Sequence, residues 1–146
     1  MYRELIEELI RNVEWARLEK PCPEAEIEKA EAYIGCRFPE ELRALLRETN
    51  GDHWLLLSAG QIIENARCNR EILSGAFENA ELFQEKVDRY IFFATNGCGD
   101  YYCYRILQDG SADAAAIYIW EHESFESRIV AGNIPQLITR YYQDEL

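Results

Sequence analysis

The sequence predicts an α+β fold in a single domain, with a mainly antiparallel central sheet flanked by N-terminal helices and a C-terminal helix. Three short apolar runs stand between Tyr90 and Trp120, separated by two glycine-containing turns. Their connections are too short for parallel crossovers, which predicts an antiparallel meander. Helical periodicity precedes and follows this stretch. A chain of 146 residues suits one domain, 1–146, and such a domain buries about 70% of its unfolded surface.

The N-terminal third carries three helical patterns. Residues 2–18 place apolar side chains at helical spacing, namely Tyr2, Leu5, Ile6, Leu9 and Val13. Pro23 begins a second helix, and Gly35 stands where a glycine commonly follows a helix end. Phe38-Pro39 begins a third helix, which ends at Asn50-Gly51. Only a few residues join the second and third helices, so we expect them to pack as a corner or hairpin.

The middle of the chain carries weaker patterns. Trp54 to Leu57 is a short apolar run that predicts a strand. Ile62 to Cys68 predicts one or two helical turns. Residues 69–89 have the weakest signal, although Glu78 to Asp88 has a helical pattern.

The meander itself has clear periodicity. Tyr90 to Ala94 is apolar throughout, which predicts a strand covered on both faces. Asp100 to Leu107 alternates, so that Tyr102, Tyr104 and Ile106 share one face while Tyr101, Cys103, Arg105 and Leu107 share the other. Ala116 to Trp120 places Ile117 and Ile119 on one face, and Tyr118 and Trp120 on the other. These alternations predict that both faces of the sheet carry large side chains.

The remaining residues complete the sheet and close the domain. His122 to Ser127 predicts a polar turn, and Arg128 to Ala131 predicts a last short strand. Asn133 is placed as the N-cap of a closing helix, whose buried side chains are Ile134, Leu137, Ile138 and Tyr141.

Composition narrows the classes of function. The chain has 27 acidic and 15 basic residues and a net charge of −12, which repels nucleic acid and anionic lipid and attracts a basic partner. No apolar run approaches the roughly 20 residues of a membrane span, and the acidic N-terminus does not resemble a signal peptide. Five cysteines, an odd number, favour free thiols. We therefore expect a cytoplasmic protein with no membrane or nucleic-acid partner.

The loop Gly97-Cys98-Gly99-Asp100 is the one stretch that suggests chemistry. A phosphate cradle needs a following helix N-terminus or lysine, whereas a strand follows here, so turn geometry explains the glycines better. Cys98 and Cys103 lack the close paired spacing of zinc ligands. Cys98 with His122 is an alternative catalytic pair, although buried free thiols explain most cysteines. We expect no catalytic residue, no metal and no cofactor.

Several motifs together resemble the SMI1/KNR4 (SUKH) family. The opening signature consists of Glu26-Ile27, Ala30-Glu31, Gly35, Phe38-Pro39-Glu40-Glu41-Leu42, Leu45 and Asn50-Gly51. Phe92 to Tyr104 is similar to the central strand motif of the family, and Ile117 to Glu123 to its next strand and turn. The resemblance covers residues 23–142, departs at Phe38, where the family more often has Leu or Ile, and is poor over 58–89.

The resemblance implies helices packed around a mainly antiparallel sheet, and a protein that acts by binding. Bacterial members are immunity proteins that bind and neutralise a cognate toxin domain, often a nuclease, and the family has no established catalytic residues. The expected partner is therefore a toxin protein with a basic active-site groove. Two alternatives remain: a regulatory scaffold module without a toxin partner, like the fungal relatives, and a small enzyme that uses the Cys98 loop.

Under the immunity interpretation, acidic and aromatic side chains near turns are the candidate partner-binding residues. Four acidic candidates, Asp109, Asp113, Glu121 and Glu123, would form a patch that meets Lys and Arg of the toxin, and Asp100 is a further acidic candidate beside a turn. The aromatic candidates are Trp54, Tyr101 and Trp120, because Trp and Tyr are enriched at interface hot spots. Core packing is the competing explanation for at least two of these three aromatic residues.

Overall fold

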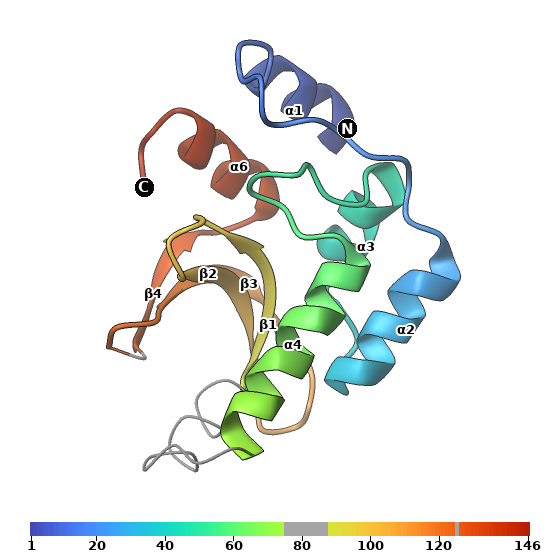
Figure 1. Cartoon of the computed structure of the whole chain (residues 1–146), viewed down its shortest axis with the longest axis vertical. Coiled ribbons are helices and arrows are strands. Elements are labelled where there is room, and N and C mark those ends of the chain that lie inside the picture. Colours follow the sequence, from blue (N-terminus) through green and yellow to red (C-terminus); the bar gives the residue numbers. More distant parts are fainter. Residues whose placement is uncertain (75–87, 125) are drawn as a thin grey trace.

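The computed structural model describes residues 1–74, 88–124 and 126–146. Within these residues, helices pack beside a four-stranded antiparallel sheet whose strands follow chain order (Figure 1). The helices are α1 (Tyr2–Leu9), α2 (Glu24–Ile34), α3 (Glu40–Glu48), α4 (Ala59–Ser74) and α6 (Ile134–Tyr142). The strands are β1 (Tyr90–Thr95), β2 (Tyr101–Ile106), β3 (Ala112–Glu121) and β4 (Glu126–Ala131). The predicted α+β fold with an antiparallel meander is confirmed.

The sheet carries large side chains on both faces, as the alternation predicts. One face joins the main core, in which Phe93 of β1 stacks on Tyr104 of β2 with ring centroids 4.9 Å apart. The other face holds a smaller cluster of Phe92, Cys103 and Trp120. Ile91–Ala94 of β1 is buried throughout. The strands are therefore held by side-chain packing on both surfaces as well as by backbone hydrogen bonds.

The predicted helix over residues 2–18 is wrong in its second half. Helix α1 ends at Leu9, and the following chain runs beside the end of α3. There the backbone N–H of Arg17 donates to the carbonyl of Asp52, and that of Cys22 donates to the carbonyl of Leu46, at 2.9 and 2.8 Å. After Leu9 the chain first turns locally, with the Val13 N–H donating to the Ile10 carbonyl at 2.8 Å, and by Arg17 the N–H is used in a tertiary contact and cannot continue a helix ladder.

Other boundaries differ from the prediction in smaller ways. Leu56 forms a single antiparallel bridge with Ala94 rather than a full strand, and α4 is a 16-residue helix rather than one or two turns. Strand β3 begins at Ala112, four residues before the predicted start. The helical pattern predicted for residues 78–88 lies almost entirely outside the described residues.

Helix ends follow the predicted signals. Asn133 caps α6, because its side-chain oxygen accepts the backbone N–H of Gln136 at 2.9 Å. Gly35 follows α2 with a φ of +84°, the left-handed conformation that glycine adopts without strain. Hydrogen bonds also connect the start of α6 to α3 and β2. The carboxylate of Glu41 in α3 accepts the N–H of Ile134 in α6 at 3.2 Å and the hydroxyl of Tyr104 in β2 at 2.6 Å.

Helices α2 and α3 are joined by an ion-pair network centred on Glu24. Arg47 donates to both Glu24 oxygens, at 3.0 and 3.1 Å, and the buried Arg43 also contacts Glu24. The hydrogen bonds from Arg47 are the main reason that the pKa of Glu24 falls from 4.5 to about 2. A carboxyl with a lower pKa in the folded state stabilises the fold above its unfolded pKa and loses that effect as the pH falls.

We predict that Glu24→Gln lowers the free energy of unfolding at pH 7. The difference from the unchanged protein should shrink as the pH falls from about 4.5 towards 2, because protonation of Glu24 removes the same ion pairs. Urea unfolding curves across this pH range measure the difference. Glu28→Gln, an exposed position on the same helix, is the control. A difference that stays constant down to pH 2 would contradict this role.

Candidate partner-binding surface

The five acidic candidates lie at opposite ends of the sheet. Because the strands are antiparallel, the β1–β2 and β3–β4 turns lie at one end and the β2–β3 turn at the other. Asp100, Glu121 and Glu123 therefore share one end, which we call the acidic sheet end. Asp109 and Asp113 lie beside the β2–β3 turn at the far end. The structure thus divides the predicted acidic patch into two separate groups.

The two far-end carboxylates take part in the turn itself. Asp109 accepts the backbone N–H and the hydroxyl of Ser111 at 2.9 and 2.6 Å, and these hydrogen bonds lower the pKa of Asp109. Asp113 accepts the backbone N–H of Ala115 at 3.0 Å. Both side chains have a structural role at the β2–β3 connection.

The three aromatic candidates differ in exposure. Trp120 is 4% exposed and packs edge-on against Phe92, with ring centroids 5.5 Å apart. Tyr101 is partly buried against the same ring at 5.4 Å. Trp54, in the loop between α3 and α4, is 45% exposed. Core packing therefore accounts for the positions of Trp120 and Tyr101, whereas Trp54 presents an open aromatic surface.

Trp54 lies in a groove that includes residues from distant parts of the chain. The exposed ring of Trp15 lies 5.3 Å from that of Trp54 at an angle of 57°. Tyr141 and Asp144, near the end of α6, line the same hollow of about 360 Å³. Burial raises the pKa of Tyr141, and hydrogen bonding from Trp54 partly offsets this rise. We call this hollow the tryptophan groove.

A buried carboxylate holds the walls of the tryptophan groove together. Asp52 is fully buried, and its Oδ1 accepts the backbone N–H groups of Trp54 and Leu56 at 3.0 and 2.8 Å. Its Oδ2 accepts the hydroxyl of Tyr142 in α6 at 2.6 Å. Burial and the nearby Asp52 charge both raise the pKa of Tyr142. Since Arg17 also donates its N–H to the Asp52 carbonyl, this residue links the Trp15 segment, the Trp54 loop and α6.

The tryptophan groove adjoins the acidic sheet end. Asn96 lines the groove and donates its side-chain N–H to Asp100 Oδ2 at 3.2 Å. Asp100 Oδ1 accepts the backbone N–H of His122 at 3.1 Å and lies 2.7 Å from its Nδ1. Burial acts to raise the pKa of Asp100, but these hydrogen bonds outweigh it and hold the pKa below its usual value. The two hairpin turns are thereby fixed beside the groove.

The loop residue Cys98 is exposed, and His122 directs Nδ1 towards Asp100. Each of the five cysteines, all of them in the described part of the chain, is a free thiol. Within the described residues, no group of three or more His, Cys, Asp or Glu side chains is arranged to hold a metal ion. In the same residues, no helix is long and apolar enough to cross a membrane.

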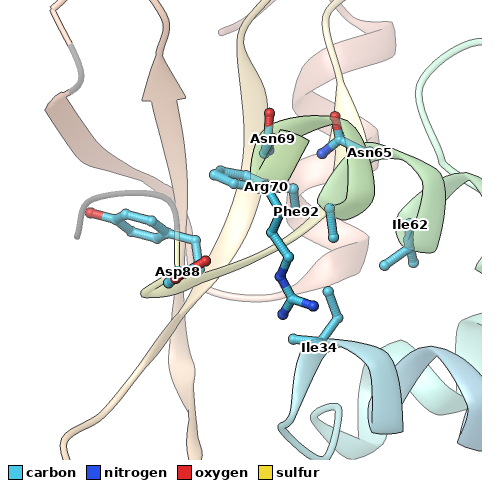
Figure 2. Close-up of a pocket in the computed structure, with 9 residues that line it drawn as sticks. Ile34, Ile62, Asn65, Asn69, Arg70, Asp88 and Phe92 are labelled. Carbon is cyan, nitrogen blue, oxygen red and sulfur yellow. The ribbon is translucent and has the colours of Figure 1, made fainter. Parts of the chain in front are cut away.

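A second, smaller hollow of about 210 Å³ lies among α2, α4 and β1 (Figure 2). Figure 2 shows Arg70 of α4 extending towards Ile34 at the end of α2. The Arg70 guanidinium lies 4.7 Å from the ring centre of Tyr33 and donates to the Tyr33 carbonyl at 3.1 Å. This arginine therefore ties α4 to the end of α2.

Sequence analysis identified Trp54 as a candidate partner-binding residue. It did not identify the other groove residues Trp15, Tyr141 and Asp144 as candidates, nor the buried Asp52 behind them. Trp15 stands off the apolar stripe of the pattern over residues 2–18, but α1 ends at Leu9, so that pattern does not account for the exposure of Trp15. No sequence signal indicated that Asp52 would be buried beside α6.

We predict that Asp52→Ala lowers the free energy of unfolding by about 3 kcal/mol, because it leaves three buried or partly buried donors without an acceptor. Tyr142→Phe removes one of these hydrogen bonds and should lower it by about 1–2 kcal/mol. Urea unfolding of both variants measures the two losses. An equal or larger loss for Tyr142→Phe would contradict the central role of Asp52.

Comparison with known proteins agrees with this architecture. A search of curated proteins found no match. The chain matches the model of the SMI1 / KNR4 family (SUKH-1) over residues 21–140, a range that includes α2, α3, α4, the whole sheet and most of α6. The chain therefore belongs to the SMI1/KNR4 (SUKH-1) family.

Proposed function

We propose that this protein is an immunity protein that binds and neutralises a cognate toxin domain, a nuclease, by direct contact. The observation that carries this proposal is membership of the SMI1/KNR4 family over residues 21–140. Members of this family act generally as immunity or regulatory proteins rather than as enzymes. Cognate partners of this kind are recognised through protein–protein contacts, so the relevant site is a surface rather than a catalytic centre.

Charge supports a basic partner. The chain has a net charge of −12, and Asp100, Glu121 and Glu123 gather at the acidic sheet end. A nuclease groove must hold phosphates and is therefore basic. An acidic surface is attracted to such a groove by the same positive potential that attracts the nucleic-acid substrate. This attraction also speeds association of the two proteins.

The proposal is tested by affinity capture of the tagged protein from its own cells, followed by co-expression. A captured basic protein that arrests growth when expressed alone, and is silenced by this chain, would support the immunity function. Stable capture of non-toxic regulatory proteins would favour the scaffold alternative instead. Loss of an activity in Cys98→Ser, with folding retained, would favour the enzyme alternative.

We predict that Glu121→Lys combined with Glu123→Lys slows association with the toxin by roughly tenfold at low salt, because attraction between the partners is reduced. Surface plasmon resonance at two salt concentrations measures the rate. Glu26→Lys with Glu28→Lys on α2 is the matched control, since it changes net charge equally at exposed positions elsewhere. Equal slowing by both pairs would show that net charge, rather than the acidic sheet end, controls association.

A further inference from the structure

The tryptophan groove has the features of a binding site for one flat, positively charged group. The Trp15 and Trp54 side chains are 58% and 45% exposed, although tryptophan is usually well buried. Tyr141 extends the aromatic wall and contacts the ring of Tyr142 edge-on at 5.2 Å. The aromatic faces carry negative electrostatic potential, which attracts cations.

The charged side chain that lines the groove is acidic. Among the described residues that line it, Asp144 is the one charged side chain. Asp100 lies next to it through Asn96, and the fully buried Asp52 carboxylate lies behind the wall. An aromatic wall with a carboxylate at its rim is complementary to a cation, whereas a purely apolar group would leave Asp144 without a partner.

Two residues with an unusual backbone conformation lie in or beside the groove segments. Among the described residues, His53 and Asp144 are the non-glycine residues with positive φ, at +64° and +62°. His53 directly precedes Trp54, and Asp144 lines the groove. Asp144 stands just past the end of α6, where its N–H donates to Tyr141 and the N–H of Glu145 donates to Arg140. Glycine usually occupies this position of a helix end, and Asp is one of the few other residues that adopt it readily, so Asp144 places a carboxylate at the groove.

We propose that the tryptophan groove binds an arginine side chain of the partner protein. The guanidinium is planar and stacks on aromatic rings, and its N–H groups suit a carboxylate such as Asp144. Lysine offers a strongly hydrated point charge that gains less from a flat aromatic wall. The inference rests on the proposed function for the identity of the partner, a basic toxin, but its chemistry is testable without that partner.

The test uses blocked arginine (N-acetyl-arginine amide) and observes tryptophan side chains by NMR. The chain has three tryptophans, so a ¹⁵N-labelled sample gives three indole N–H signals. Arginine amide should shift the signals of Trp15 and Trp54 in a saturable manner, while buried Trp120 serves as the internal reference. The neutral isostere N-acetyl-citrulline amide should produce less than one fifth of the shift at the same concentration.

Variants separate the groove from the rest of the surface. Trp54→Ala should weaken arginine binding at least fivefold, and because Trp54 is exposed the variant should still fold. Asp144→Gly should weaken binding at least threefold while keeping or raising stability, since glycine suits the positive φ. Ile129→Ala, an exposed apolar position on β4, is the matched control and should leave binding unchanged.

Three results would overturn the inference: no shift of either exposed indole, equal shifts with citrulline, or equal shifts with blocked lysine. The outcome is independent of the toxin experiments. Arginine binding without toxin neutralisation would overturn the proposed function and leave the groove assignment intact. Toxin neutralisation without arginine binding in the groove would overturn the groove assignment and leave the proposed function intact.

Discussion

The buried Asp52 carboxylate is the interaction on which the candidate surface depends. A carboxylate removed from water is costly unless hydrogen bonds replace the lost solvent, and here two backbone N–H groups and the Tyr142 hydroxyl replace it. These three donors are neutral groups, two from the Trp54 loop and one from α6. One side chain thus holds the loop that carries Trp54 against α6.

Sequence patterns predicted the sheet well because each strand is locally encoded. The alternation in β2 and β3 assigned Tyr102, Tyr104, Ile117 and Ile119 to one face, and the core contains all four. The helix over residues 2–18 was overextended for the opposite reason. Its periodicity continues to Val13, but the helix ends at Leu9, the chain turns locally through Val13, and from Arg17 onwards long-range hydrogen bonds to Asp52 and Leu46 position the backbone. No local pattern encodes partners that lie some thirty residues away.

The candidate surface could be predicted only in part, because it is assembled across the chain. Trp54 was identified from its residue type and its place beside a turn. Trp15, Tyr141 and Asp144 come from segments that meet only after folding. Asp52 is a residue type that is common in turns, so its sequence context does not indicate that it is buried beside α6. Conversely, Trp120 had the residue type of a hot spot, but strand alternation directs it into a buried aromatic cluster. Residue type indicates what a side chain can do, whereas burial decides whether a partner can reach it.

Under the proposed function, the acidic sheet end and the tryptophan groove would act on a partner over different ranges. Exposed carboxylates act on an approaching basic partner over roughly 10 Å in 0.1 M salt, but they contribute little to the final affinity. An aromatic groove acts only on contact, and a pre-shaped groove supplies affinity because little order is lost on binding. Glu123 stands on the β3–β4 turn and Glu121 at the end of β3, both at the sheet end, whereas the groove is fixed by the buried Asp52. Under the same proposal, substitutions at the acidic sheet end would alter partner choice without disturbing the tryptophan groove.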